Sequence, residues 1–168
     1  MVTIASTDTL FVATANSNEP PASAFMTLDT RNAHLVLDAD DTTDEECVFS
    51  GVMPQNFTAS GGLTIKIHFM ATTATSGNAV LQAAIETEAS LDRDADSFAA
   101  FQSSGAVAVN GTSGIESIAT VTMTNAQADS VAAGDAFRIK IRRDADDTSA
   151  TDSVTGDLEI VEVEIRET

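Results

Sequence analysis

The chain has 168 residues, of which 43% are hydrophobic, and this is enough apolar material for the core of one domain. Its 26 acidic residues outnumber its 8 basic residues, so the formal net charge at pH 7 is −18. Nucleic acids and anionic membranes are bound through basic surfaces, so the charge argues against both classes of binding protein. We expect a protein that stays soluble through its charge or works in a saline medium; the alternative is a specific cationic partner.

The apolar residues are mostly small and aliphatic: there is no Trp or Tyr, and there are eight Phe. Core volume must therefore come from Val, Ile, Leu and Ala, which suits the thin core of a β-sandwich. Cys47 is the only cysteine, which excludes an intrachain disulfide. Its apolar neighbours Val48 and Phe49 predict a buried, unreactive thiol. No run reaches the roughly 20 apolar residues needed for a membrane-spanning helix.

Residues 1–22 are predicted to form an extended N-terminal arm, and residues 23–168 a single β-sandwich domain. Residues 9–15 alternate loosely between apolar and polar side chains. The run that follows ends in Pro20 and Pro21, and two consecutive prolines cannot enter a central strand. Two interpretations stay open: the arm lies on a neighbouring subunit, or it forms an edge strand followed by a loop.

Short segments with strand-like alternation follow the arm. Residues 63–69 place apolar side chains at odd positions and polar ones at even positions, which predicts a strand with one buried and one solvated face. In the final strand, the apolar positions change from even to odd after Ile160, so we predict a β-bulge near Ile160 and Val161. Strands are predicted at 23–29, 33–38, 46–53, 63–73, 79–88, 115–124, 135–143 and 157–166.

Residues 89–114 lack this alternation. Ser97–Phe101 could form one helical turn capped by Asp96, and residues 125–129 a second turn before Gly134. Short helical turns in long connections are typical of jelly-roll and Greek-key sandwiches. The sequence therefore predicts an all-β fold: an antiparallel, jelly-roll-like β-sandwich of about eight strands with one or two short helical turns.

Half of the basic residues lie on the strand predicted at 135–143. Its polar face could grip a phosphate, a sulfate or an acidic glycan. Alternatively, it forms ion pairs with Glu162 and Glu164 of the final strand, if the two strands pair, or with an acidic neighbouring subunit. Exposed strand charges more often form ion pairs than ligand sites, so we favour ion pairs. The basic residues are Arg138, Lys140, Arg142 and Arg143.

Aspartates cluster at 38–41, 92–96 and 144–147. Aspartate is disfavoured in strands and bonds to backbone amides in turns, so the clusters predict turns between strands. The second cluster has D-x-D-x-D spacing, and alternate carboxylates can bind Ca²⁺. An EF-hand needs Gly at loop position six and an acid at position twelve, where this chain has Ser97 and Ser103. A calcium site of another kind is the one metal candidate, and no other cofactor is predicted; its residues are Asp92, Asp94 and Asp96.

Motifs of the common catalytic classes are absent from the sequence, including the nucleophile elbow, the zinc-protease motif and the P-loop. His34 and His68 lie in strand-like runs, where a histidine is more often a packed or surface residue than a ligand. Carboxylate pairs for glycoside hydrolysis can be found among 26 acids, but no Trp or Tyr offers a platform for a sugar. We therefore predict a structural or binding module and not an enzyme.

Three segments carry a resemblance to a known group of proteins: residues 40–57 (DDTTDEECVFSGVMPQNF), 74–80 (ATSGNAV) and 161–167 (VEVEIRE). Together they resemble small, acidic β-sandwich virion proteins of tailed bacteriophages, especially marine ones. The resemblance extends over roughly residues 37–167, and residues 1–36 fall outside it. It implies a jelly-roll-like sandwich that is present in many copies on a particle, as a symmetric oligomer.

On this resemblance we expect a structural protein of a tailed-phage virion, namely a capsid decoration or cement protein that binds the assembled head and stabilises it. Capsids offer threefold sites, so we expect a homotrimer on the capsid surface, with the major capsid protein or other virion proteins as partners. The net charge argues against a nucleic-acid or membrane partner. The alternative is a tail-fibre or spike domain that binds host-surface glycans. The expected interface residues are Met1, Val2, Ile4, Leu10, Phe11, Pro20, Pro21, Arg138, Lys140 and Arg142.

Overall fold

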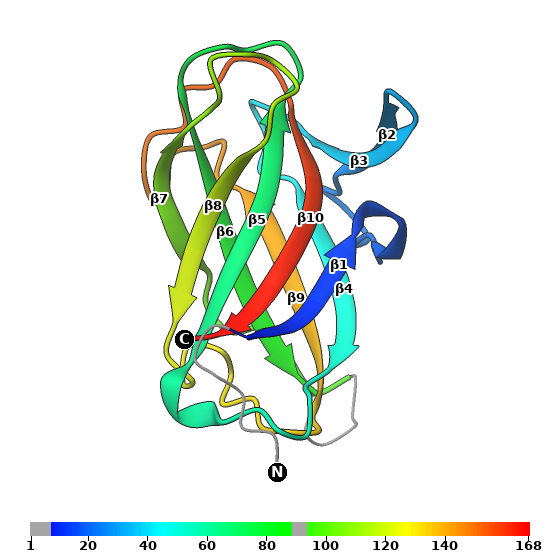
Figure 1. Cartoon of the computed structure of the whole chain (residues 1–168), viewed down its shortest axis with the longest axis vertical. Coiled ribbons are helices and arrows are strands. Elements are labelled where there is room, and N and C mark those ends of the chain that lie inside the picture. Colours follow the sequence, from blue (N-terminus) through cyan, green and yellow to red (C-terminus); the bar gives the residue numbers. More distant parts are fainter. Residues whose placement is uncertain (1–7, 89–93) are drawn as a thin grey trace.

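The computed structural model describes residues 8–88 and 94–168 and shows two antiparallel β-sheets packed face to face (Figure 1). Sheet A has the strand order β2-β3-β10-β5-β8, and β1 pairs with the half of β10 that β3 leaves free. Sheet B has the order β4-β9-β6-β7. This arrangement confirms the predicted antiparallel β-sandwich, with ten strands in the described part of the chain where about eight were expected.

The strand bounds are as follows. Sheet A contains β1 (Thr9–Thr14), β2 (Thr27–Arg31), β3 (His34–Ala39), β5 (Leu63–Ala71), β8 (Ser117–Met123) and β10 (Leu158–Glu167). Sheet B contains β4 (Glu46–Val52), β6 (Asn78–Thr87), β7 (Gln102–Ala108) and β9 (Ala136–Arg143). No helix within residues 8–88 and 94–168 is long and apolar enough to cross a membrane.

The core lies between the sheets and is built from alternating side chains, as predicted. The odd-numbered residues from Leu63 to Phe69 on β5 are fully buried, and those from Phe137 to Ile141 on β9 meet them from the opposite sheet. Cys47 on β4 lies in the same core. Burial raises the pKa of its thiol well above the usual range, so the thiol stays protonated and unreactive.

The predicted β-bulge is present in β10. Ile160 pairs with Phe69 on β5, and Glu162 pairs with the next residue, His68, so Val161 is the extra residue. The bulge moves the following part of the strand by one residue, which restores its apolar side chains to the core face. Buried apolar residues therefore lie on both sides of it: Leu158, Ile160, Val163 and Ile165.

The second half of the predicted N-terminal arm is part of the sandwich. Thr9–Thr14 form β1, which pairs with β10 at one edge of sheet A. Ala13 and Ala15 are buried in the core, and the ring of Phe11 contacts that of Phe137 edge to face at a centroid distance of 5.4 Å. Of the two interpretations left open, the edge strand followed by a loop describes residues 9–22.

Strand β7 was not predicted, because its sequence does not alternate. It pairs with β6, and the register shifts between Val80 and Gln82. Gly105, near this shift, has a φ of +66°, a conformation that glycine adopts without strain. The strand therefore owes its conformation to its neighbour and not to a pattern of its own.

The short helical turns lie at other positions than predicted. The prediction of a helical turn at 97–101 is wrong, because this segment has irregular backbone. It is bonded to β6, since the Ala99 N–H donates to the Ile85 carbonyl at 2.9 Å. At 125–129 the chain forms a hydrogen-bonded turn without a helix. In the described part of the chain, 3-10 turns form at η1 (Ala15–Ser17) and η2 (Ala59–Gly61).

Candidate functional site

The hairpin of β2 and β3 projects from the side of the sandwich (Figure 1). Arg31 pairs with His34, so only Asn32 and Ala33 form the turn. Both turn residues have positive φ, of 47° and 64°, as in a type I′ turn, whose twist matches that of paired strands. Every residue of β2 up to Thr30 is exposed, so the hairpin presents much of its surface to solvent.

Arg31 holds the tip of the hairpin against the sandwich. Its guanidinium donates to the carbonyl oxygens of Ala71 and Thr72, at 3.2 and 3.3 Å, where β5 ends. It also donates to the Glu159 carboxylate at 2.5 Å and to the Ser113 hydroxyl at 3.0 Å. Because these partners come from β5, β10 and the loop before β8, one side chain sets the position of the hairpin relative to all three.

A groove of about 510 Å³ lies between the hairpin tip, η1 and the outer face of sheet A, and we call it the hairpin groove. Its volume falls within the range of about 300–1,000 Å³ that is usual for small-molecule sites. The aliphatic part of its lining comprises Leu35, Val36, Met70 and Val161, the extra residue of the bulge. The polar part includes Asn16, Arg31, Asn32, His34, Glu116 and Glu162.

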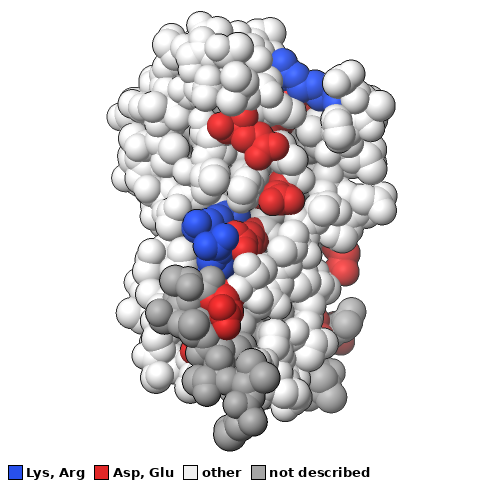
Figure 2. Space-filling view, in the orientation of Figure 1, with Lys and Arg blue, Asp and Glu red and all other residues white. Residues whose placement is uncertain are grey.

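The two carboxylates of this lining, Glu116 and Glu162, flank His68 on the outer face of sheet A. The Nδ1 of His68 lies 3.3 Å from Oε2 of Glu116, and its Nε2 lies 3.8 Å from Oε1 of Glu162. The side chains of Glu116 and Glu162 are 48% and 41% exposed, against 18% for His68. Figure 2 shows this face of the molecule, on which charged side chains form a column down the middle, over β5 and β10. Charge is therefore concentrated along one wall of the groove.

A second depression, of about 240 Å³, adjoins the hairpin groove and is more apolar. Ala15 and Asn16 line both. Phe25 and Leu28 contribute side chains that are 47% and 53% exposed. All eight phenylalanines lie within the described residues, and the seven others are buried or half-buried, so Phe25 is the one ring that is open to a ligand.

The basic stripe predicted on β9 lies on the outer face of sheet B. Because β9 pairs with β4 and β6 and not with β10, the expected partners Glu162 and Glu164 are in the other sheet, and that part of the prediction is wrong. Alternation predicts which face of a strand is buried, but not which strand lies beside it. Each cation instead meets an acid of sheet B or of the loop before it: Arg138 meets Glu86 at 2.5 Å, Lys140 meets Glu46 at 2.8 Å, and Arg142 meets Asp44 at 3.3 Å.

Two phenylalanine rings lie over this stripe. The Nζ of Lys140 is 4.5 Å and the guanidinium carbon of Arg138 is 5.1 Å from the centre of the Phe98 ring, and the guanidinium carbon of Arg142 is 4.1 Å from that of Phe101. These distances are those of cation–π contacts. The cations are thus engaged on two sides within the chain, and their predicted part in a subunit interface stays a prediction.

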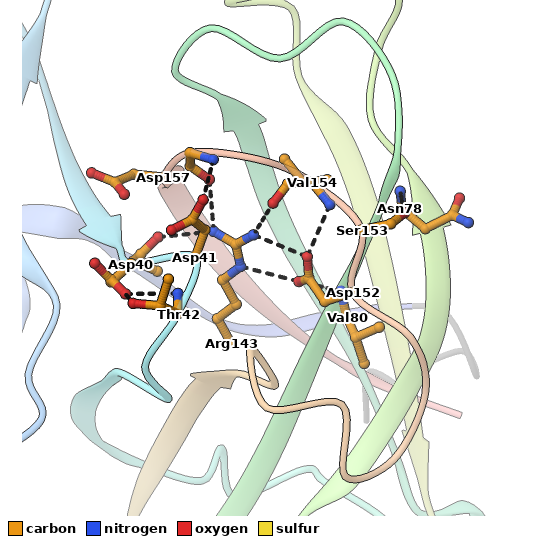
Figure 3. A network of polar contacts seen from close by, with 12 residues as sticks. Asp40, Asp41, Thr42, Asn78, Val80, Arg143, Asp152, Ser153, Val154 and Asp157 are labelled. Atoms are coloured by element: carbon orange, nitrogen blue, oxygen red, sulfur yellow. Dashed lines mark hydrogen bonds and ion pairs between the residues drawn. The ribbon is translucent and has the colours of Figure 1, made fainter.

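Arg143 is fully buried and does not belong to the basic stripe. Figure 3 shows the network of polar contacts around its guanidinium. Its Nε and one Nη2 hydrogen donate to the Asp152 carboxylate at 3.0 and 2.9 Å. The remaining hydrogens donate to the carbonyl oxygens of Ala39, Gly156 and Val154, at 3.1, 2.9 and 2.8 Å. All five N–H donors of this fully buried guanidinium are therefore satisfied. Arg143 joins the ends of β9 and β3 to the loop that precedes β10.

The aspartates at 38–41 act largely as turn residues beside Arg143. Asp40 accepts hydrogen bonds from the backbone N–H groups of Thr42 and Thr43, at 2.7 and 2.9 Å, and Asp41 accepts one from Gly156 at 2.5 Å. These are the local bonds for which aspartate is favoured in turns. The first aspartate cluster thus ties its own loop to the loop that precedes β10.

Asp144 has the same role in the cluster at 144–147. Burial raises the pKa of its carboxyl, but hydrogen bonds from the hydroxyl and N–H groups of Ser149 and Thr148 outweigh this effect and lower the pKa to about 2. The carboxylate is thus held in its charged form by the loop that follows it.

Two groups of carboxylates in the described residues have oxygens within 4.8 Å of one another, close enough to hold a cation: Asp40, Asp41 and Asp157, and Asp44, Asp144 and Asp146. In both groups, oxygen atoms already accept hydrogen bonds from the protein, and the geometry assigns these residues to the turns. Of the predicted calcium residues, Asp92 lies outside the described residues, and Asp94 and Asp96 belong to neither group. That calcium site stays a prediction.

Asp38 on β3 has an unusual environment for a carboxylate. Burial is the largest cause that raises its pKa, from 3.8 to about 6, and the charges of four neighbouring acids raise it as well. These neighbours are Asp29, Glu159, Asp157 and Glu45. Asp38 is therefore the carboxyl group in this region whose charge is least favourable.

The predicted interface residues of the arm are spread over the structure. Met1, Val2 and Ile4 lie outside the described residues. Leu10 and Phe11 are half-buried against the core, Pro20 lines the apolar depression, and Pro21 is half-buried in the loop. The hairpin groove was not predicted, because its walls come from five segments that are distant in sequence. The stretch Arg31-Asn32-Ala33-His34, between two alternating segments, is the signal that could have indicated the hairpin turn.

No known protein family matches the sequence, and no curated protein matches it. Solved structures do share the fold. The C-terminal CBM6 of LamC, a marine laminarinase from Zobellia galactanivorans, is 10% identical, covers 95% of this chain and 99% of its own, and has a TM-score of 0.51. The CBM22-2 xylan-binding domain of Paenibacillus barcinonensis Xyn10C is 14% identical, with coverages of 94% and 99% and a TM-score of 0.52. The xylan-binding module CBM15 is 13% identical, with coverages of 95% and 97% and a TM-score of 0.50.

This likeness corrects the expected function. The three structures are carbohydrate-binding modules, and they share the fold of this chain over nearly its whole length. They favour the glycan-binding alternative and overturn the prediction of a capsid decoration protein. That prediction rested on short segments such as 40–57, which in the structure form a turn, strand β4 and the chain beyond it. The resemblance itself, over roughly residues 37–167, stays a prediction.

Proposed function

We propose that this protein is a non-catalytic carbohydrate-binding module that binds a glycan in the hairpin groove. The observation that supports this most directly is a groove of about 510 Å³, lined by both polar and aliphatic side chains, on a fold shared with carbohydrate-binding modules. Fold alone does not imply function, so the proposal depends on the chemistry of the groove.

The polar lining of the groove suits the hydroxyl groups of a sugar. Asn16 and Asn32 each offer an amide that donates and accepts, and the exposed imidazole of His34 does both in its neutral form. Glu116 and Glu162 add acceptors on the opposite wall. A sugar hydroxyl both donates and accepts, so a mixed set of this kind can satisfy several hydroxyls of one residue.

The adjoining apolar depression suits the C–H face of a pyranose ring. The exposed ring of Phe25 can pack against such a face, and Leu28 lies beside it. A saccharide of several units would place one unit in the hairpin groove and another on Phe25, because the two depressions share Ala15 and Asn16. Phe25 thus takes the part that Trp or Tyr would take in a chain that had them.

Glycan binding does not by itself decide whether the protein belongs to a virion. A tail-fibre or spike domain that binds host-surface glycans is compatible with this site. The virion location and the homotrimeric state stay predictions, which the copy number in purified particles and the mass of the protein in solution would test.

Binding to a panel of soluble polysaccharides and oligosaccharides tests the proposal, measured by affinity electrophoresis and then by titration calorimetry. Replacing Phe25 with Ala should weaken binding about tenfold, because a stacked aromatic ring contributes on the order of 1 kcal/mol beyond its buried area. His34→Ala should weaken it as well. Val52→Ala is the matched control, since Val52 is 62% exposed on β4 and lines neither depression. If the folded wild-type protein binds no glycan in a broad panel, the proposal is wrong.

A further inference from the structure

We infer that the hairpin groove selects glycans that contain a protonated amino sugar over neutral and uronic-acid glycans. This inference rests on the proposed function and adds the class of sugar. The reason is that the lining of the groove carries more negative than positive charge that is available to a ligand.

The one guanidinium in the groove lining is already neutralised. Arg31 donates to Glu159 at 2.5 Å, and it also donates to two carbonyl oxygens and to the Ser113 hydroxyl. The side chain of Glu159 is only 8% exposed, so this carboxylate serves Arg31 and is turned away from solvent. A uronate in the groove would therefore compete with a buried carboxylate for Arg31 and would not find a free cation there.

Among the residues that the structure describes, no Lys or Arg forms an ion pair with the two carboxylates in the lining. The nitrogen atoms beside them are those of His68: Nδ1 lies 3.3 Å from Glu116, and Nε2 lies 3.8 Å from Glu162, which is beyond hydrogen-bond distance. Both carboxylates are more than 40% exposed, whereas the imidazole between them is largely covered. Neutral His68 leaves the pair with a charge of −2, and protonated His68 still leaves −1.

A sugar ammonium fits this arrangement better than a hydroxyl or an acetamide does. It carries a positive charge and three N–H donors, so it can donate to a carboxylate and to a neutral acceptor such as Asn32 at once. A charge-assisted hydrogen bond is roughly twice as strong as a neutral one. The net charge of −18 makes the potential around the whole molecule negative, which acts in the same direction on the approaching ligand.

Three oligosaccharides of equal length separate the classes: a glucosamine oligomer, its fully N-acetylated counterpart and a uronic-acid oligomer, each titrated by calorimetry at a pH where the amine is protonated. The glucosamine oligomer should bind about tenfold more tightly than the N-acetylated one, and the uronate should bind most weakly. The preference should shrink as salt is raised, because both carboxylates are exposed enough to be screened.

Variants locate the effect. Glu116→Gln and Glu162→Gln keep the size and the acceptor oxygen of each side chain but remove its charge, and the double variant should lose the preference while it retains binding of the N-acetylated oligomer. Asp146→Asn is the matched control: it removes one exposed charge from a residue that does not line the groove, and it should leave the preference unchanged.

The outcomes distinguish this inference from the proposed function. Equal binding of the glucosamine and N-acetylated oligomers, or a preference for the uronate, overturns the inference and leaves glycan binding in place. An equal loss of preference in Asp146→Asn and in the two Glu variants also overturns it, because net charge and not the groove would then select the ligand. If the protein binds none of the three and no other glycan, the proposed function itself fails.

Discussion

At the scale of single residues, the stability of the fold depends on charged groups that are fully or partly buried. Arg143 is fully buried and is the largest such side chain in the described part of the chain, yet all of its donors are satisfied. Asp38 shows the opposite situation, a carboxyl group among other acids whose pKa is raised by burial and by their charges. Arg143 therefore stabilises the fold through its hydrogen bonds, whereas the ionised form of Asp38 destabilises it.

Replacing Arg143 with Met should destabilise the protein by about 3–5 kcal/mol, because Asp152 would keep a charge in a site where it is 3% exposed, without its partner. Urea unfolding measures the free energy. In a double-mutant cycle, Asp152→Asn in the Arg143→Met background should restore part of the loss, since the unpaired charge is then gone. A loss below about 1 kcal/mol for Arg143→Met would show that the network is dispensable.

Asp38→Asn should make the protein more stable at pH 7 and have no effect below about pH 4. The pKa of Asp38 is about 6 in the folded protein against 3.8 as its ordinary value, so the folded state holds the proton more tightly. The stability that this provides is present below pH 4 and is lost as the pH rises through 6. The difference in melting temperature between wild type and variant, followed over this range, checks the sign. A difference that is independent of pH would contradict the assignment.

At the scale of elements, the bulge in β10 links the core to the groove. It brings Leu158 and Ile160, and then Val163 and Ile165, to the same buried face. It also places Val161 in the groove lining. One extra residue therefore serves both the packing of sheet A and the shape of the proposed binding site.

Deleting Val161 should unfold the protein or cost at least about 3 kcal/mol. Without the extra residue, one half of β10 must turn its two large apolar side chains outward, at about 1.5–3 kcal/mol each. Thermal unfolding followed by circular dichroism measures the loss. Val161→Ala is the control, because it keeps the bulge and removes only a half-buried side chain. A deletion variant as stable as Val161→Ala would mean that the strand can pair in another register.

At the scale of the whole molecule, the net charge of −18 opposes the compact state. The cations that could offset it are mostly engaged locally, in the stripe on sheet B and at Arg143 in the interior. Many acids are exposed and repel one another through solvent, where salt screens them.

Raising the salt concentration from low ionic strength to about 0.5 M should therefore stabilise the protein, by on the order of 1–2 kcal/mol. Urea unfolding at several concentrations of sodium chloride measures the effect. The same series with Arg143→Met separates the contribution of surface charges from that of the buried Arg143–Asp152 pair, because salt screens the buried pair far less than the surface charges. A decrease in stability with salt would mean that surface ion pairs outweigh the repulsion.

The sequence by itself determined the fold class, the buried face of the main strands, the bulge after Ile160 and the burial of Cys47. The first three follow from side-chain alternation along single segments, and the burial of Cys47 follows from its apolar neighbours; both are local properties of the chain. Alternation did not predict β7, whose conformation comes from pairing with β6. The ion pairs with Glu162 and Glu164 depended on pairing between the basic strand and the final strand, which is wrong, because nothing local says which strand lies beside β9.

Only the tertiary structure decided where a ligand site could form. The hairpin groove joins Asn16, Arg31, Glu116 and Glu162, residues of four segments that are distant in sequence and that meet through sheet pairing and the hydrogen bonds of Arg31. The aspartate clusters, conspicuous in the sequence, proved at 38–41 and 144–147 to be largely occupied with turns and with the loops around Arg143. A site depends on contacts between distant segments, and these are set by the packing of the whole sandwich and not by any one stretch of residues.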